Sequence, residues 1–87
     1  MKAKVINVII REDESGMFFA SSSDLRGLHL ACETLDELRE EIPLIIKLLL
    51  EAEGLKVSVI EAEAKDLEKL GVRPWIAVPA AQLSAAH

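Results

Sequence analysis

The chain has 87 residues, of which half are hydrophobic but only three are aromatic, and its formal net charge is −5. A chain this short forms one domain with an aliphatic core, and it buries only about 60–65% of the surface that its unfolded form exposes. The negative charge argues against a nucleic-acid backbone as the main partner, because binding to phosphates depends on clustered Lys and Arg.

The single cysteine and the lack of a long apolar run limit the compartment. Cys32 has no second cysteine with which to form an internal disulfide, which is typical of a protein in a reducing cytoplasm. The N-terminal run MKAKVINVII is too short for a signal peptide, and no apolar stretch reaches the ~20 residues that cross a membrane. We therefore expect a cytoplasmic protein without a membrane span.

Three segments in the first third of the chain have the composition of β-strands. Lys4–Arg11 is rich in β-branched residues and is apolar on both faces, which predicts a central strand. Met17–Ser22 and Leu28–Cys32 follow it, after turns that contain Gly16 and Gly27 respectively. We expect these three strands to form an antiparallel meander.

A long helix follows the third strand. Thr34 and Glu37 have the spacing of a capping box, which predicts the start of the helix, and Gly54 predicts its end. Pro43 lies inside the pattern, so the helix should kink or restart there, with a bend at Ile42. The side chains expected to face the sheet recur at helical spacing, at Leu35, Leu38, Ile42, Ile45, Ile46 and Leu49.

The second half of this helix is apolar on more than one face. Leu44, Leu48 and Leu50 add apolar surface to flanks that a helix lying on one sheet would leave polar. Two explanations are open: the C-terminal segment folds over these leucines, or a second copy of the chain packs against them. On the second explanation they are the candidate interface of a homodimer.

The remainder of the chain contains weaker signals. Lys56–Ile60 alternates as a fourth strand, and Ala64–Leu70 has the composition of a helical turn. Trp75–Val78 lies between two prolines, which predicts a short edge strand or an extended segment. We expect residues 1–79 to form the domain and residues 80–87 to be a frayed tail.

The order of these elements predicts an α+β fold. A right-handed crossover through the helix places the fourth strand beside the first and parallel to it, with the helix covering one face of the sheet. No second domain is expected.

The run from Glu12 to Glu51 resembles the HicB-like antitoxin domain, and more closely its short stand-alone relatives that are labelled a domain of unknown function. The shared pattern is an acidic turn ending in Gly, an Asp-Leu-x-Gly-Leu turn, and a Thr-Leu-x-Glu-Leu helix start followed by Ile-Pro. The residues at those places are Gly16, Asp24, Leu25, Gly27, Leu28, Thr34, Leu35, Glu37, Leu38, Ile42 and Pro43.

This resemblance implies a partial RNase H-like fold. In full-length members it implies that the domain neutralises a small basic mRNA-cleaving toxin of the HicA-like kind, while a separate C-terminal domain binds operator DNA. The present chain departs from that pattern in two ways. Arg26 stands where the family commonly has Pro, and no ribbon-helix-helix or helix-turn-helix pattern follows the sheet. We therefore expect no direct DNA binding.

The residues that could carry chemistry are not spaced for it. His29 and Cys32 are three apart on one strand, so they point to opposite faces and cannot share a metal or form a nucleophile–base pair. The acids of the first turn lack the alternating oxygen spacing of a calcium loop. The RNase H carboxylate set is not expected either, since the acids cluster in a turn and on a helix face. We expect no enzymatic activity and no catalytic, cofactor-binding or metal-binding residue.

Three functional hypotheses follow. In the first, the chain is a non-catalytic, antitoxin-like protein that masks a basic toxin with an acidic rim. In the second, it is a stand-alone homodimeric adaptor or regulatory domain without a toxin. The third, an enzyme or a small-ligand binder, has the least support. The candidate partner-binding residues of the first hypothesis are Asp13, Glu14, Glu33, Glu40 and Glu41.

Overall fold

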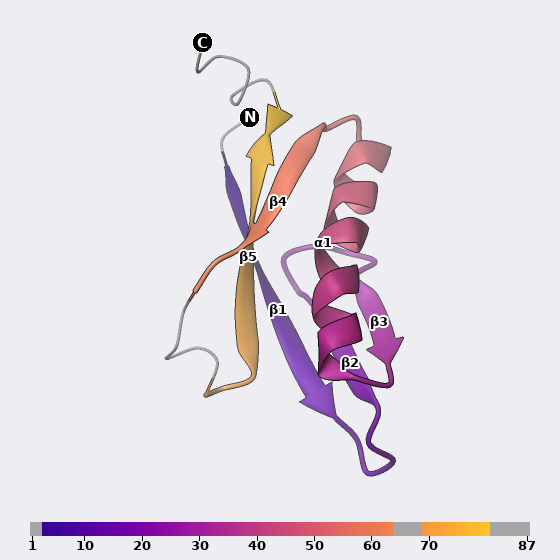
Figure 1. The fold of residues 1–87 in the computed structure, drawn as a ribbon. Coiled ribbons are helices and arrows are strands. Elements are labelled where there is room, and N and C mark those ends of the chain that lie inside the picture. Colours follow the sequence, from indigo (N-terminus) through magenta and orange to yellow (C-terminus); the bar gives the residue numbers. More distant parts are fainter. Residues whose placement is uncertain (1–2, 64–68, 81–87) are drawn as a thin grey trace.

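The computed structural model describes residues 3–63 and 69–80. In these residues one helix packs against one face of a five-stranded antiparallel sheet (Figure 1). The strand order is β3-β2-β1-β5-β4. The elements are β1 (Lys4–Glu12), β2 (Phe18–Ser21), β3 (His29–Cys32), α1 (Leu35–Ala52), β4 (Val57–Glu61) and β5 (Val72–Pro79). The predicted α+β class, the meander and the helix on the sheet are confirmed.

The expected pairing of the fourth strand with the first is wrong. β5 lies between β4 and β1 and pairs antiparallel with both, so β4 becomes an edge strand. The predicted partial RNase H-like arrangement depended on that parallel pairing and is not supported. The segment Trp75–Val78, expected at an edge, belongs to a strand inside the sheet.

The two prolines do not prevent β5 from occupying an interior place, because each lies where a neighbouring ladder ends. The Pro74 carbonyl accepts a bond from the Ala62 N–H at 2.9 Å, so the donorless Pro74 nitrogen points toward the end of β4. The Ala80 N–H donates to the Lys56 carbonyl at 2.8 Å, so by alternation Pro79 faces the β1 side. The last pair of the β1–β5 ladder there is Lys4 with Ala77.

β1 is the longest strand and has different partners along its two halves. Its second half pairs with β2 from Ile9 onward, and its first half pairs with β5 on the other edge. Beyond the end of β2 its backbone is bonded by a loop: the Asn7 N–H donates to Asp24 Oδ2 at 2.8 Å, and Ser22 Oγ donates to the Asn7 carbonyl at 2.6 Å. Asp24 of the Asp-Leu-x-Gly-Leu turn therefore continues the ladder with its side chain.

Local bonds begin and end α1 as predicted. Thr34 Oγ1 accepts from the Glu37 N–H at 3.1 Å, which confirms the hydroxyl half of the capping box. Gly54 has φ of +87°, and the Leu55 N–H donates to the Leu50 carbonyl at 2.9 Å, which is a Schellman ending. The helix is continuous through Pro43, so the predicted restart at that residue is wrong.

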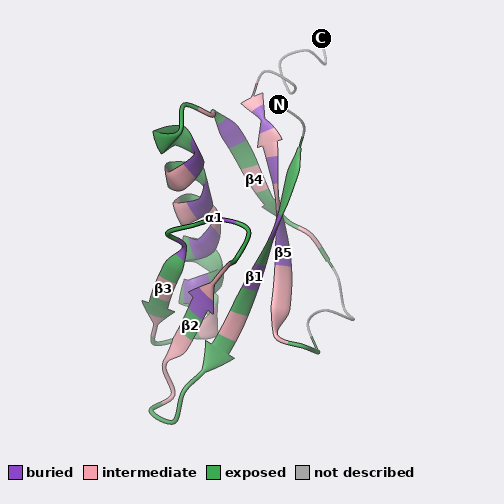
Figure 2. Ribbon diagram, turned by 180° about the vertical axis from the view of Figure 1, so that it is seen from behind, coloured by how far each residue is buried: buried purple, intermediate pink, exposed green. Residues whose placement is uncertain are grey.

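The core lies between α1 and the sheet (Figure 2). Two leucines of the loop between β2 and β3 enter it, so the Asp-Leu-x-Gly-Leu turn is part of the scaffold. The buried core residues are Ile6, Val8, Ala20, Leu25, Leu28, Leu38, Ile42, Ile46, Leu50, Val57, Trp75 and Ala77. The predicted helical turn at Ala64–Leu70 falls mainly outside the described residues, and so does most of the predicted tail at 80–87.

Candidate functional site

The face of the sheet that points away from α1 is apolar and exposed, and we call it the open sheet face. Side chains alternate along a strand, so burying Ile6 and Val8 of β1 against the helix directs Val5 and Ile9 to the opposite side. Their strand neighbours extend the apolar surface. The large exposed side chains of this face, with their exposed fractions, are Val5 (53%), Ile9 (42%), Phe19 (39%) and Ile60 (56%).

The open sheet face carries little charge. The two acids within the described strands are Glu12 and Glu61, and their register partners are Phe18 and Trp75, which place both acids on the side of the helix. At the β1–β2–β3 side of the open sheet face, the polar side chains include Arg11 and His29. Within the described strands, therefore, no acid has its register position on the open sheet face.

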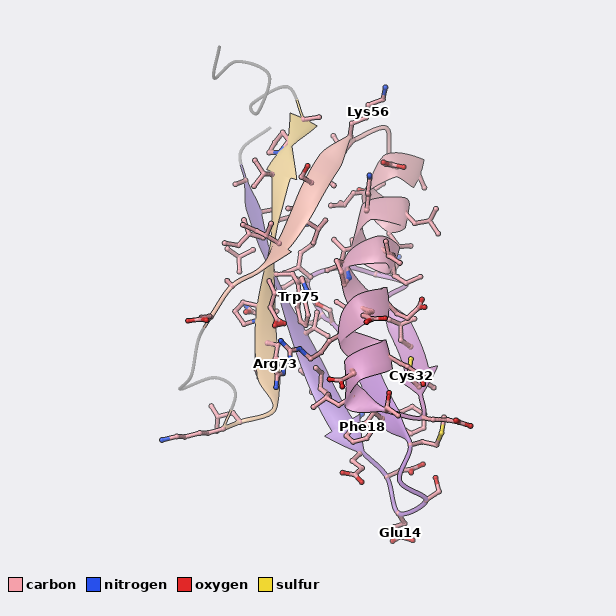
Figure 3. The ribbon with its side chains drawn as sticks, viewed as in Figure 1. Glu14, Phe18, Cys32, Lys56, Arg73 and Trp75 are labelled. Atoms are coloured by element: carbon pink, nitrogen blue, oxygen red, sulfur yellow. The ribbon has the colours of Figure 1, made fainter. Side chains whose placement is uncertain are left out.

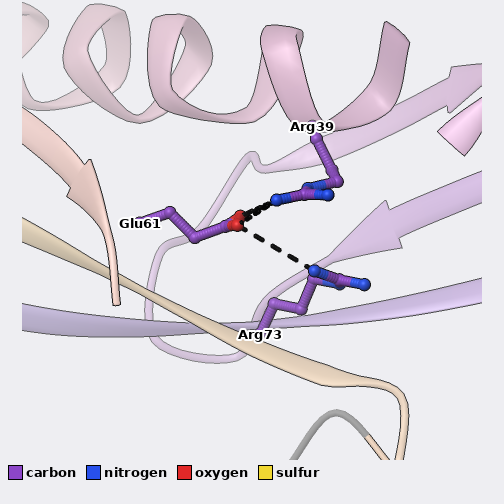
Figure 4. Close-up of polar contacts among 3 residues, drawn as sticks. All are labelled: Arg39, Glu61 and Arg73. Atoms are coloured by element: carbon purple, nitrogen blue, oxygen red, sulfur yellow. Dashed lines mark hydrogen bonds and ion pairs between the residues drawn. The ribbon is translucent and has the colours of Figure 1, made fainter. Parts of the chain in front are cut away.

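A polar cleft of about 420 Å³ lies on the other side of the sheet, between the first half of α1 and strands β4 and β5. Arg39 of α1 donates a hydrogen bond from Nη2 to Oε1 of Glu61, at the end of β4, over 2.7 Å. Arg73 Nη1 of β5 lies 3.9 Å from the same carboxylate oxygen (Figure 4). The residues that line the cleft are Asp36, Arg39, Glu40, Pro43, Val59, Glu61 and Trp75.

The chemistry of this cleft is that of an ion-pair network. Its lining includes carboxylates and a guanidinium but neither a His nor a Ser or Cys that could form a nucleophile–base pair. The Arg39 side chain is partly exposed, and such pairs contribute about 0.2–1 kcal/mol to stability. Within residues 3–63 and 69–80, no three His, Cys, Asp or Glu side chains are grouped to hold a metal.

The five acids predicted to bind a partner are all exposed, but they do not form one rim. Asp13 and Glu14 lie in the β1–β2 turn at one end of the molecule, where Figure 3 shows Glu14 at the tip. Glu33 follows β3. Glu40 lines the cleft beside β4 and β5. Glu41 is on the opposite flank of α1, where its negative charge raises the pKa of Cys32 in β3. The structure thus distributes the predicted acids over three regions: the β1–β2 turn, the flank of α1 beside β3 with Glu33 and Glu41, and the cleft with Glu40.

Asp13 has a structural role in its turn. Its Oδ1 accepts from the Ser15 N–H at 2.9 Å, from Ser15 Oγ at 2.6 Å and from the Met17 N–H at 3.0 Å. The bond from the Ser15 hydroxyl is the largest cause that lowers the pKa of Asp13 below its usual value of 3.8, and the backbone N–H groups act in the same direction. The Asp13 carboxylate is therefore engaged within the hairpin.

This engagement predicts a pH-dependent stability. A pKa that is lower in the folded than in the unfolded chain stabilises the fold above the unfolded pKa, and that contribution is lost as the pH falls below 3.8 through the folded pKa. We expect Asp13→Ala to have a lower free energy of unfolding than the wild type at pH 5. Between pH 5 and pH 3 this free energy should fall less in the variant than in the wild type, and urea unfolding at each pH measures both values. Glu14→Ala is the matched control in the same turn. Equal pH slopes for Asp13→Ala and the wild type would contradict the bonding described.

The three leucines predicted at a dimer interface separate into two groups. Leu44 and Leu48 are 61% and 62% exposed, one helical turn apart on the outer face of α1. Leu50 is only 1% exposed and belongs to the core, because it continues the four-residue spacing of Leu38, Ile42 and Ile46. The alternative in which the C-terminal segment folds over the leucines is wrong as far as residue 80, since that segment enters the sheet as β5.

Cys32 and His29 point to opposite faces of β3, as their spacing predicts. Burial raises the pKa of the Cys32 thiol, and the negative charges of Glu37 and Glu41 raise it further. The thiol is therefore held in its protonated, less nucleophilic form.

Sequence reasoning missed two features that the structure displays. The open sheet face is visible in part in the sequence, since both faces of Lys4–Arg11 are apolar, but that pattern predicts burial on both sides. The contact of Arg39 with Glu61 joins residues far apart in the chain, and no local pattern indicates it.

Among the described residues, no helix has the length and apolar character needed to cross a membrane.

One family model matches this chain. It covers residues 4–69 and is described as Domain of unknown function (DUF1902). This match confirms the resemblance to a domain of unknown function, and it does not single out the HicB-like antitoxins. No curated protein matches the chain, and no solved structure does.

Proposed function

Because the chain belongs to this family of unknown function, whose description states no activity, we propose a function from the molecular surface: a non-catalytic protein-interaction domain that binds through its open sheet face. The observation that carries the proposal is the exposure of Val5, Ile9, Phe19 and Ile60 on one side of a sheet whose other side is covered by α1.

The physical argument is the cost of leaving this surface in water. Apolar surface removed from water stabilises by about 25 cal/mol per Å², and monomeric proteins seldom expose a contiguous apolar patch beyond a few hundred Å². Scattered single side chains would need no explanation, but these four share one face of adjoining strands. The shape, a twisted and nearly uncharged sheet surface, suits a partner that is itself apolar there.

The antitoxin-like role is a narrower form of the same proposal. In its favour, the five acids predicted to meet a basic toxin are all exposed. Their distribution over three regions means that a single basic partner would contact only some of them. We retain this role, the absence of enzymatic activity, the absence of DNA binding and the cytoplasmic location as predictions.

Site-specific photo-crosslinking in living cells tests the proposed function. We expect a photo-reactive p-benzoylphenylalanine in place of Phe19, on the open sheet face, to give discrete crosslinked protein products. The matched control carries the same side chain in place of Leu48, which is exposed on the outer face of α1. Crosslinks from position 48 with none from position 19 would contradict binding through the open sheet face, and crosslinks from neither position would contradict an interaction domain.

A further inference from the structure

We propose that the occupant of the open sheet face is a second copy of this chain, so that two sheets pack face to face with their helices outward. This inference rests on the proposed function, and it goes further because it identifies the partner. Sheets that pack in this way lie about 10 Å apart with strands either aligned or nearly perpendicular, and the inner faces supply an apolar core.

The distribution of charge favours a second copy over a basic partner on this face. Each chain carries a formal net charge of −5, so two copies repel unless they meet where acids are absent. The strand acids Glu12 and Glu61 face the helix side, and the predicted acids lie in turns and on α1. The open sheet face therefore presents no carboxylate from its own register positions, and the acids beside it, Glu12 and Asp13, lie at its edge next to Arg11 and Phe19. A basic partner would find no opposite charge on the strands there.

The size of the face is of the right order for self-association. Five strands about 4.8 Å apart, of which the longest has nine residues at about 3.3 Å each, cover roughly 500–700 Å² before the relief of the side chains is counted. Stable interfaces bury about 800 Å² on each partner. A domain of 87 residues buries little of its own surface and gains proportionally more from pairing.

The chemistry of the side chains also suits a self-complementary contact. Two copies related by a two-fold axis present the same patch to each other, so the patch must be complementary to itself. Val5, Ile9 and Ile60 are β-branched, stiff and uncharged, and they lose little conformational freedom when they are covered. The exposed leucines of α1, Leu44 and Leu48, form a smaller apolar surface than the open sheet face. The charged side chains of Lys47 and Glu51 flank them.

Sedimentation equilibrium of the purified chain from about 1 to 100 µM tests this inference. We expect the wild type to have about twice the chain mass of 9.6 kDa. The open-face variant Ile9→Thr with Ile60→Thr keeps β-branched residues in both strands, and it should raise the dissociation constant about 100-fold or more, because four buried contacts are weakened in each dimer. The matched helix variant, Leu44→Gln with Leu48→Gln, should leave the dissociation constant within about twofold.

Two checks make the outcomes decisive. Far-UV circular dichroism and the fluorescence of Trp75, the single tryptophan, show whether each variant is folded. Crosslinking of purified chains from position 19 should give a product of twice the chain mass. This test remains valid even if the open-face variant does not fold. The control with the crosslinker at position 48 should give no such product.

Three results would overturn the inference. A wild type that stays monomeric at 100 µM rules out a second copy, and the proposed function then survives only if position 19 crosslinks to another protein in cells. Loss of the dimer in the helix variant but not in the open-face variant moves the interface to Leu44 and Leu48. Dimers that persist in a folded open-face variant, with no crosslink from position 19, place the interface elsewhere.

Discussion

Replacing Trp75 with alanine should lower the free energy of unfolding by about 3–5 kcal/mol, the range for removing a large buried aromatic side chain. Trp75 is 1% exposed, lies opposite Ile6 in the β1–β5 ladder and packs under α1. The total stability expected for a chain of this length is about 4–13 kcal/mol, so the substitution should remove a large fraction of it. Urea unfolding followed by circular dichroism measures the change, since the variant has no tryptophan to report it.

The expected effect of Trp75→Ala depends on the interior position of β5 in the sheet. Amide hydrogen exchange tests that position independently. In an interior strand consecutive N–H groups are bonded to different neighbours, so Ile76, opposite Ile60, and Ala77, opposite Lys4, should both be protected. In the edge strand β4, the Val59 N–H points away from β5 and should exchange fast. Rapid exchange at either Ile76 or Ala77, together with a loss below about 1 kcal/mol in Trp75→Ala, would return β5 to the edge.

Replacing Leu50 with alanine should cost about 2–5 kcal/mol of unfolding free energy, because the substitution leaves a cavity beneath the end of α1. Leu48→Ala is the matched control two residues earlier in the same helix. Leu48 is exposed, so its replacement should change the free energy by no more than about 0.5 kcal/mol. Thermal unfolding followed by Trp75 fluorescence compares the two variants at one protein concentration.

This pair separates a core residue from an interface residue. If Leu50→Ala unfolds at the wild-type temperature and instead weakens self-association, Leu50 faces a partner as the apolar flank of the helix predicts. If Leu48→Ala is the more damaging variant, the outer face of α1 is covered in the folded protein.

The sequence alone determined those features that a few neighbouring residues can satisfy among themselves. The helix begins after Thr34 and ends before Gly54 because the Thr34 hydroxyl and the positive φ of Gly54 allow backbone bonds to be completed within one turn. The antiparallel order of β1, β2 and β3 follows from short turns at Gly16 and Gly27, which leave each strand next to the preceding one. The burial of Leu50 was also accessible, from its spacing of four after Ile46.

Only the tertiary structure decided which strand pairs with the free edge of β1, the edge opposite β2. β4 and β5 could each have paired with β1, and local composition favoured β4 because β5 contains two prolines. The prolines cost nothing in the ladder where they point past the ends of neighbouring strands, and the burial of Trp75 against Ile6 and the helix favours β5 in that place.

The candidate surface was decided in the same way. The apolar pattern of β1 predicts two buried faces, but a chain of this length supplies one helix, and a single helix covers one face of a sheet. Which face is covered depends on contacts between α1 and strands distant in sequence. Within residues 3–63 and 69–80, α1 is the one layer that covers the sheet, so Val5 and Ile9 on its other face are exposed, and no window of neighbouring residues contains that information.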